Sequence, residues 1–530
     1  MLKSSKLTGG KMKNESIEKK SILLKALGAV EKAGNKLPHP VMLFIYGIIL
    51  VLALSYLFSL IGLSVEDPRK AGVIISVKSL VGADGLIYIL THAISNFIGF
   101  APLGTVLVSM LGIGIAERSG LIEATLKSLV QVTPKRLITM IVVFAGVVSN
   151  VAGELGYVVL VPLGAVIFYG FGKHPLAGLA AAFAGVSGGY SANLLIGTVD
   201  PLLAGLSQEA ARFIDPTYTV GAEANWYFMV ASTFLITILG TIVTEKIVEP
   251  MLGKYGNSQA RDKIANEFDT LTPLEKRGLK VSGLVSIAFF GLLAWSVLPE
   301  NGILLNQKTM TLAGSPFLHS IVPFVFLFFS INGIVYGYIT KEYKSAEDVI
   351  DATTKSMGAM ASYIVLSFFM AQFISYFGYT NLGLVLSISM AEGIKNIGAN
   401  GPVLMISFIF IAAFANLFMG SASAKWALMA PIFIPMLMLL GYSPEVTQVA
   451  YRIGDSTTNI ISPLMSYIGI ILYSAQRYIK NFGLGNLLSL MLPYSLVFLI
   501  FWSVFFYLWV FVFGLPVGPG SPSEFIMGGR

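Results

Sequence analysis

Long apolar runs alternate with short polar segments over most of this 530-residue chain. Residues 40–63 hold no charged residue, and about 20 apolar residues are enough for a helix to cross a hydrocarbon core of about 30 Å. Further apolar runs occupy 85–116, 225–244, 281–298, 316–340, 352–376 and 484–513. The pattern predicts an all-α polytopic membrane protein, because the strands of a β-barrel would alternate apolar and polar residues instead.

The polar interruptions in two other apolar regions form an internal repeat. When residues 149–188 are shifted by 269 positions, their landmarks coincide without a gap. Glu154 then falls on Ser423, Tyr157 on Trp426, Pro162 on Pro431, Gly172 on Gly441, Pro175 on Pro444, Gly185 on Gly454 and Ser187 on Ser456. Paired, interrupted apolar segments in the two halves of a membrane protein indicate the binding site of a transporter. The alternative is chance similarity between glycine-rich apolar stretches.

Basic residues are distributed unevenly over the predicted loops. With a cytoplasmic N-terminus, 26 lysines and arginines fall on the cytoplasmic side and 7 on the outer side, in agreement with the positive-inside rule. This orientation requires the regions around 137–169 and 403–440 to form re-entrant hairpins, separated by five full crossings. Since an odd number of crossings inverts the second hairpin, the sequence predicts inverted repeats with two re-entrant hairpins, broken helices and about nine transmembrane crossings.

The repeats divide the chain into a scaffold and a transport unit. We predict a cytoplasmic basic tail at 1–38, scaffold helices at 39–134, repeat 1 of the transport unit with the first hairpin at 135–248, a cytoplasmic loop at 249–278, further scaffold helices at 279–400, repeat 2 with the second hairpin at 401–513 and a tail at 514–530. Residues 381–400 are expected to form an outer surface helix and turn. The two tails are turn-rich or lysine-rich, and no structure is assigned to them.

Composition excludes several other classes of protein. Cysteine is absent and the four histidines are scattered, so neither disulfides nor transition-metal sites are expected. The chain has no G-x-x-x-x-G-K-[ST] loop for ATP and no H-E-x-x-H motif of a metalloprotease. The net charge of +7 is explained by membrane topology, so nucleic acid is not expected as a partner. We therefore predict a transporter rather than an enzyme, with the lipid bilayer as its surroundings.

The second interrupted stretch of repeat 2 holds the strongest candidates for chemistry. Arg452, Asp455, Ser456 and Asn459 are spaced to share one helical face. A charge at bilayer depth costs about 2.5–3.5 kcal/mol on insertion scales, so it should face a partner or a cavity. One interpretation is a guanidinium offered to a substrate carboxylate, with Asp455 tuning it or contacting a cation. The alternative is an Arg452–Asp455 pair that only holds a helix break.

The tip of the second hairpin adds three candidates. Ser423 can donate to a carboxylate, and the Trp426 indole offers a flat face to an aromatic ligand. Alternatively, the tip is packed for close approach and Trp426 fills a core or an interface. Lys425 contributes positive charge or extends to the membrane rim instead.

Polar residues at both interruptions suggest a cation site. Ser149, Asn150 and Glu154 lie in the first hairpin, and Asn193 and Asn459 lie in the second interrupted stretch of each repeat. Side-chain oxygens and freed backbone carbonyls are hard ligands that suit Na⁺. The alternative is hydrogen bonding between helices. Asp200, which precedes a proline, is interpreted from its local sequence as a helix stop.

The interrupted stretches resemble the p-aminobenzoyl-glutamate transporter (AbgT) family. The most specific are SNVAGELGYVVLVPLGA, GVSGGYSANLL with DPLLAG, GSASAKWALMAPIFIPM and AYRIGDSTTNIISPLMSY. The resemblance implies a homodimer whose protomers have nine crossings and two hairpins, with an inner scaffold and an outer transport unit. The family's substrate-contacting positions match here as Asp200, Ser423, Trp426, Arg452, Asp455 and Pro463. Its substrates are p-aminobenzoyl-glutamate and, for some members, sulfonamide-type drugs.

The expected function is secondary active transport across the cytoplasmic membrane. The residues alone indicate a carrier of an organic anion, and the resemblance specifies p-aminobenzoyl-glutamate or a related aromatic anion, with export of sulfonamide-type antimetabolites as one mode. Because no ATP site is found, the expected driving force is a Na⁺ or H⁺ gradient acting through alternating access, and no other cofactor is expected. A carrier of non-aromatic dicarboxylates such as succinate or citrate, with the same fold, is the main alternative.

Overall fold

A computed structural model describes residues 38–70, 72–131, 134–152, 156–255, 271–312, 314–398 and 401–526. The fold is helical, and the described residues form only one small sheet, in which β1 (Ser64–Glu66) pairs antiparallel with β2 (Ile74–Ser76). The predicted basic tail at 1–38 lies almost entirely outside the described residues.

The first part of the chain forms long helices and then the first hairpin. The helices are α2 (Pro40–Leu60), α3 (Ala83–Ile98), α4 (Ala101–Arg118) and α5 (Leu121–Gln131). The first repeat follows as α6 (Ile138–Val148), a 3₁₀ turn (Ser149–Ala152), a π-helical turn (Gly156–Leu160) and α7 (Val161–Gly170). It continues through α8 (Pro175–Phe183), a π-helical turn (Ala184–Gly188), α9 (Val199–Ala211), α10 (Trp226–Val243), a π-helical turn (Thr244–Val248) and α11 (Glu249–Leu252).

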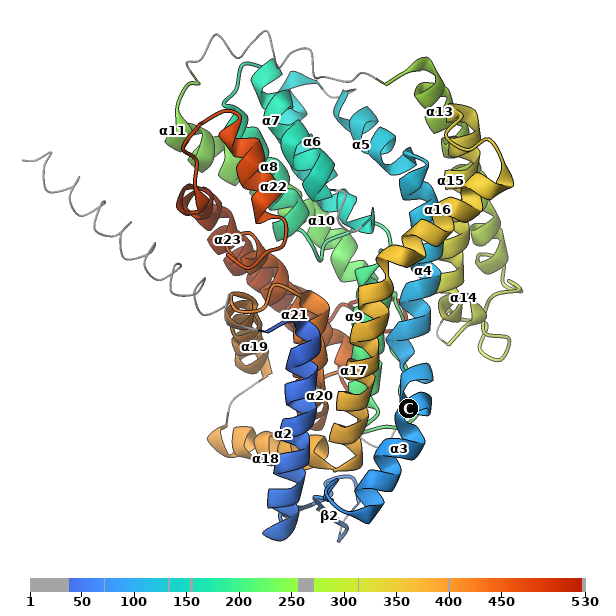
Figure 1. The fold of residues 1–530 in the computed structure, drawn as a ribbon, viewed down its shortest axis with the longest axis vertical. Helices are drawn as coiled ribbons and strands as arrows, with labels where there is room; N and C mark the ends of the chain where they lie inside the picture. Colours follow the sequence, from blue (N-terminus) through green and yellow to red (C-terminus); the bar gives the residue numbers. More distant parts are fainter. Residues whose placement is uncertain are drawn as a thin grey trace, which may run out of the picture.

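The second part repeats this order. Between the repeats lie α13 (Pro273–Val297), α14 (Pro316–His319), α15 (Ile321–Thr340), α16 (Ala346–Ala359), α17 (Ala361–Tyr379) and α18 (Leu382–Ile397). The second repeat comprises α19 (Gly401–Asn416), α20 (Ala422–Leu439), α21 (Pro444–Asn459), α22 (Ile468–Gln476), α23 (Leu484–Tyr507) and a π-helical turn (Leu508–Val512). α18 covers most of the stretch predicted as an outer surface helix and turn, and it runs across the lower end of the molecule (Figure 1).

Eight helices of the described chain are long and apolar enough to cross a membrane. They confirm the predicted polytopic helical class, although the boundaries of several runs differ. The run at 352–376 is divided between α16 and α17 at Met360, and α13 begins at Pro273 within the predicted cytoplasmic loop. α13 starts early because Thr272 and Glu275 form a capping box, which stabilises a helix start in charged sequence.

The two hairpins are inverted and broken. α6 and α7 lie in the upper half of Figure 1, whereas α19 and α20 lie in the lower half and open the other way. The chain loses α-helical geometry at 149–152 and 156–160, and again at 417–421. Each repeat then turns at a glycine with positive φ, Gly172 (76°) or Gly441 (92°). In each repeat the next helix then begins with a proline. His174 caps the start of α8, and Ser443 caps the start of α21.

Close backbone contacts define the repeat more sharply than the sequence does. A Cβ atom on Gly185 would lie 2.3 Å from the Val143 carbonyl oxygen in α6, and one on Gly454 would lie 2.4 Å from the Ile409 carbonyl oxygen in α19. The glycines are 269 positions apart, but their partners are 266 apart. The shift of 269, made for residues 149–188, therefore does not extend into the first arm of the hairpin, because the tip of the second hairpin holds three additional residues.

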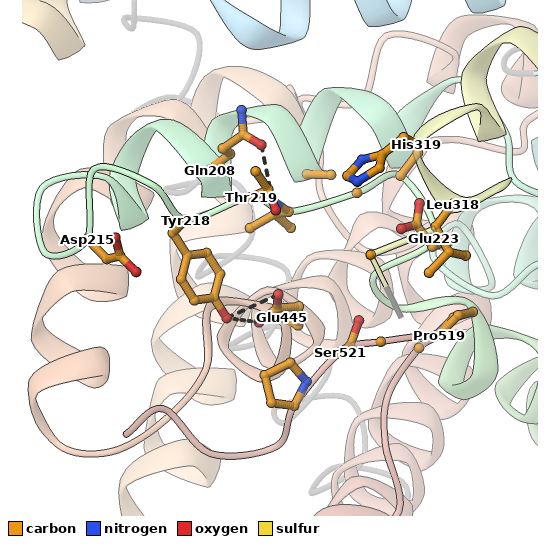
Figure 2. Close-up of a pocket in the computed structure, with 18 of the residues that line it drawn as sticks. Gln208, Asp215, Tyr218, Thr219, Glu223, Leu318, His319, Glu445, Pro519 and Ser521 are labelled. Carbon is orange, nitrogen blue, oxygen red and sulfur yellow. Dashed lines mark hydrogen bonds between the residues drawn. The ribbon is translucent and has the colours of Figure 1, made fainter. Parts of the chain in front are cut away.

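The C-terminal segment is folded, contrary to the expectation of no structure after residue 513. Phe228 donates its amide to the Val517 carbonyl at 3.0 Å, and Phe525 donates to the Gly441 carbonyl at 2.8 Å. This segment covers one side of a cavity of about 1980 Å³ (Figure 2). Glu223 and Glu445 line the cavity, and burial raises the pKa of the Glu223 carboxyl to about 7.

Candidate functional site

A buried ion pair joins the two repeats. Arg452 in α21 places Nη2 2.7 Å from Oδ1 of Asp200, at the start of α9. Asp200 Oδ2 accepts the Gly197 amide at 2.7 Å, so this carboxylate fixes the broken segment that precedes α9. Asp200 therefore begins a helix, and its interpretation as a helix stop is wrong. The physical reason is that acceptors near a helix N-terminus satisfy free amides there.

The guanidinium of Arg452 retains unused donors. Its side chain is 4% exposed, and neither Nε nor Nη1 has a hydrogen-bond partner among the described residues. Buried donors without partners cost free energy, more so when they carry charge. The free Nε–H and Nη1–H lie on different edges of the planar guanidinium, so each can donate a separate hydrogen bond to an anionic acceptor.

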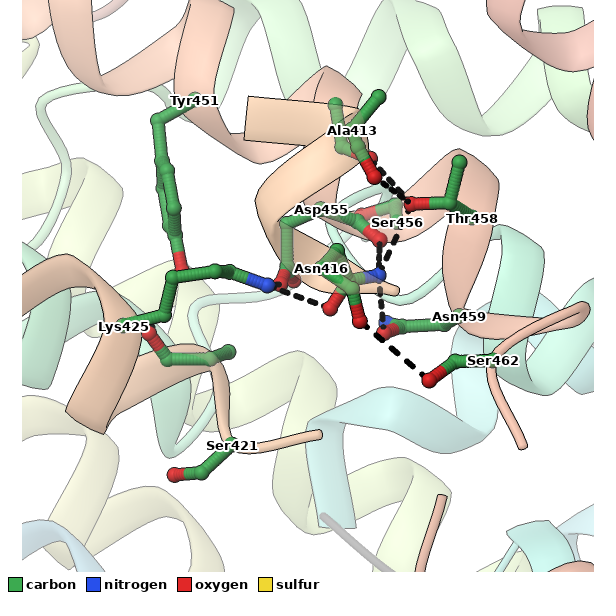
Figure 3. A network of polar contacts seen from close by, with 12 residues as sticks. Ala413, Asn416, Ser421, Lys425, Tyr451, Asp455, Ser456, Thr458, Asn459 and Ser462 are labelled. Atoms are coloured by element: carbon green, nitrogen blue, oxygen red, sulfur yellow. Dashed lines mark hydrogen bonds and ion pairs between the residues drawn. The ribbon is translucent and has the colours of Figure 1, made fainter. Parts of the chain in front are cut away.

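A second buried ion pair lies one helical turn away. Lys425 Nζ is 2.5 Å from Asp455 Oδ1, and the two side chains are 1% and 2% exposed. Lys425 also donates to Asn416 Oδ1, and Asn416 Nδ2 donates to the Asp455 carbonyl at 2.6 Å (Figure 3). Lys425 therefore does not extend to the membrane rim. The alternative of an Arg452–Asp455 pair is also wrong, because each charge has a partner from another helix.

Trp426 is fully buried beside this network. Its ring stacks on Tyr451 with centroids 4.3 Å apart, and its Nε1 donates to Ser207 Oγ at 3.0 Å. Ser207 donates to Gln448 at 2.6 Å, which connects α20 to α9 and α21. Protein encloses the indole, which is 0% exposed, and a ligand contact at Trp426 stays a prediction.

The remaining predicted substrate contacts lie at the ends of helices. Ser421 caps α20 by accepting the Ala424 amide at 3.3 Å, and its Oγ lies 3.3 Å from Ser423 Oγ. Ser423 is partly exposed, as is Pro463 in the break between α21 and α22. A partly exposed hydroxyl at a hairpin tip is available to a ligand.

The predicted cation ligands divide between the two repeats. In the first, Ser149 donates to the Gly146 carbonyl at 2.7 Å, and Asn150 donates to the Gly189 carbonyl at 3.3 Å. Asn193 Oδ1 accepts the adjacent Leu194 amide at 3.0 Å. In the second, Asn459 Oδ1 accepts from Asn416 at 2.8 Å. Glu154 lies outside the described residues.

Hydrogen bonding brings the two interrupted stretches together. Ser456 Oγ in α21 accepts the Ser191 amide at 3.1 Å, across 265 positions of the chain. With the Arg452–Asp200 pair, this contact places the first helix break and the start of α9 against α21, whose own break follows at 460–467. Asn416 was not predicted from the sequence; the only signal for it is a single polar residue at the end of an apolar run (FIFIAAFAN).

Comparison with known proteins identifies the family. The AbgT transporter family model matches residues 25–525. The p-aminobenzoyl-glutamate transport protein of Escherichia coli is 39% identical over 510 residues, which cover 96% of this chain and 99% of that protein. The chain belongs to the AbgT transporter family.

Two solved AbgT-family structures have the same fold. The YdaH transporter of Alcanivorax borkumensis is 44% identical, with a TM-score of 0.85, and the match covers 91% of this chain and 100% of that one. MtrF of Neisseria gonorrhoeae is 56% identical, with a TM-score of 0.88 over 94% and 100% of the two chains, and is described among antimetabolite efflux pumps. This AbgT-family chain is therefore a multi-pass membrane transporter.

Proposed function

We propose that this transporter moves p-aminobenzoyl-glutamate or a related aromatic organic anion, including sulfonamide-type antimetabolites, across the cytoplasmic membrane. The observation that supports this most directly is the buried Arg452 guanidinium with two unused donor nitrogens. An anionic group of the substrate would accept from one of those nitrogens, and the aromatic ring would approach Trp426. Asp200, Ser423, Asp455 and Pro463 complete the proposed contact set.

The proposed mechanism is alternating access. The units at 135–248 and 401–513, which hold both hairpins, would move the substrate against the scaffold at 39–134 and 279–400. The ion pairs of Arg452 with Asp200 and of Lys425 with Asp455 connect elements within these moving units only. They would therefore travel with the substrate rather than break at each cycle.

The charge of the substrate determines how many coupling ions each transport direction needs. A membrane potential is worth about 2.3 kcal/mol per charge per 100 mV, so a dianion is driven outward by about 4.6 kcal/mol. Import would need more than two co-transported cations, whereas export needs few or none. We propose that a Na⁺ or H⁺ gradient supplies the coupling. The protein would work as a homodimer with a cytoplasmic N-terminus.

Flux measurements in proteoliposomes test this proposal. Uptake and release of labelled p-aminobenzoyl-glutamate would be followed with Na⁺ and pH gradients imposed separately. We expect saturable flux that one gradient accelerates and that succinate does not inhibit. A flux that neither gradient changes would exclude a coupled carrier. Full inhibition by succinate would favour a general dicarboxylate carrier.

A further inference from the structure

The two hairpin tips hold asparagines in matching positions. Asn416 at the end of α19 donates Nδ2 to the Asp455 carbonyl, and Asn150 just after α6 donates Nδ2 to the Gly189 carbonyl. Under the offset of 269 that relates Gly185 to Gly454, the counterpart of Gly189 is Thr458, whose Oγ1 also accepts from Asn416 Nδ2 at 3.0 Å. The two asparagines are 266 positions apart, which is the same offset that relates Val143 to Ile409 in the first arms. Each asparagine therefore turns its amide to the opposing helix break.

In the second repeat, a cation lies against the side-chain oxygen of this asparagine. The Lys425 ammonium donates to Asn416 Oδ1 and forms its ion pair with Asp455 (Figure 3). The ring of Tyr451 lies 5.7 Å from the same ammonium. The protein thus supplies its own cation at this position.

In the first repeat, the matching oxygen has no such partner. Asn150 Nδ2 donates to the carbonyls of Val147 (3.1 Å) and Gly189 (3.3 Å), which fixes the orientation of the amide. Oδ1 is buried and has no hydrogen-bond partner among the described residues. The Ser191 hydroxyl, two positions after Gly189, is likewise buried without a partner in the described chain.

The first repeat has no lysine to fill this position. The shift of 269 places Gly156 opposite Lys425. A Cβ atom on Gly156 would lie 2.1 Å from Ser149 Oγ and 2.9 Å from a Val186 methyl carbon, so the site has no room for a side chain. Ser149 uses its proton to donate to Gly146, which leaves its oxygen lone pairs available.

We propose that the first repeat binds one Na⁺ ion at the position that the Lys425 ammonium fills in the second. Asn150 Oδ1 and Ser191 Oγ would be ligands, and Ser149 Oγ and carbonyls of the interrupted stretch 189–198 would complete an all-oxygen shell, which suits a hard cation. The stretch lies close enough to contribute, because a Cβ atom on Gly197 would be 3.2 Å from the Asn150 carbonyl oxygen. The assignment of this Na⁺ as the coupling ion of transport rests on the proposed function.

Equilibrium binding of ²²Na⁺ to the purified protein, without substrate, tests the site. We expect one ion per chain, displaced by unlabelled Na⁺ but not by K⁺. Ser191→Ala should weaken binding at least tenfold, because it removes a ligand without breaking any hydrogen bond of that hydroxyl in the described chain. Ser330→Ala is the matched control, since Ser330 is another buried serine whose hydroxyl has no partner among the described residues, and it should bind Na⁺ normally.

A second variant tests the equivalence of the two positions. Lys425→Met removes the internal cation and leaves Asp455 and Asn416 facing a small cation from solution, so we expect two bound Na⁺ ions. No Na⁺ binding by the wild-type protein, or equal binding by the two serine variants, would overturn the site. A single ion bound by a folded Lys425→Met would overturn the equivalence. Na⁺ binding without p-aminobenzoyl-glutamate transport would contradict only the proposed function.

Discussion

The two buried cations of the candidate site are each neutralised by an aspartate from a different helix. Arg452 pairs with Asp200 and Lys425 pairs with Asp455, at 2.7 and 2.5 Å. A buried ion pair recovers its desolvation cost only when geometry is good and further hydrogen bonds are made. Lys425 and Asp200 meet this condition, because each makes a hydrogen bond besides its ion pair. Arg452 meets it only in part, because Nε and Nη1 have no partner among the described residues. The unused donors of Arg452 make it the residue most dependent on a ligand.

The partners of these charges could not be predicted from spacing alone. The i, i+3 relation of Arg452 and Asp455 suggested a pair, because helical neighbours are the only contacts that a sequence shows directly. Asp200 lies 252 positions from Arg452 and was named only through the family resemblance. Long-range pairing depends on how the repeats pack, which no local pattern encodes.

At the residue scale, Glu223 should make stability depend on pH. Burial raises its pKa from 4.5 to about 7, so folding favours the neutral carboxyl. This contribution is complete below about pH 4.5 and is lost as the pH rises through 7, by up to about 3 kcal/mol. Thermal unfolding should show Glu223→Gln gaining stability over the wild type between pH 5 and pH 8. An equal difference at every pH, or the same gain for the exposed control Glu300→Gln, would contradict the prediction.

Trp426→Ala should affect aromatic substrates selectively. The ring already stacks on Tyr451, and an aromatic ligand would add a further ring contact worth about 0.5–1.5 kcal/mol. We expect affinity for p-aminobenzoyl-glutamate to fall roughly tenfold, while affinity for glutamate derivatives without a ring is unchanged. Trp426→Phe keeps a ring, so its affinity for p-aminobenzoyl-glutamate should lie between those of the wild type and Trp426→Ala. Unchanged affinity in Trp426→Ala would remove this residue from the site.

At the element scale, a glycine in each repeat lets the hairpin arm touch the broken helix. Gly185 lies against α6 and Gly454 lies against α19 at distances that exclude any side chain. The sequence predicted the glycines, the prolines and the interruptions, because these are local signals. It could not show the three additional residues in the second tip, since a gapless self-match hides an insertion.

Gly454→Ala should separate α21 from α19. Its Cβ would lie 2.4 Å from one backbone atom of α19 and 2.7 Å from another. Backbone atoms of a packed helix cannot move aside as a flexible side chain can. We expect a loss of stability of about 1–3 kcal/mol or more, measured by thermal unfolding in detergent. Gly469→Ala in α22 has open space around it and should be neutral or slightly stabilising. Equal effects of the two changes would contradict the close-contact account.

At the scale of the whole molecule, the inverted arrangement follows from an odd number of crossings between the repeats. The charge distribution predicts which side faces the cytoplasm, and the folded helices place the hairpins in opposite directions (Figure 1). The C-terminal segment was missed, because proline and glycine suggest turns but do not show what a segment packs against. It is held by backbone hydrogen bonds to Phe228 and Gly441.

Orientation can be tested directly, because the chain contains no cysteine. Thr309→Cys lies in the exposed loop after α13, and Lys344→Cys lies in the exposed turn after α15. In intact cells, a membrane-impermeant maleimide should label the first from outside and the second only after permeabilisation. The reverse pattern would contradict the predicted cytoplasmic N-terminus.

In the proposed site, the two inverted repeats present Arg452 to a substrate carboxylate. The most direct test compares affinities of wild type and Arg452→Gln for p-aminobenzoyl-glutamate and for its uncharged diamide, by titration calorimetry. We predict that the change costs the anion about 1.5–3 kcal/mol, or roughly ten- to hundredfold in affinity, and leaves the diamide nearly unaffected. An equal loss for both ligands would contradict the claim and assign Arg452 a structural role only.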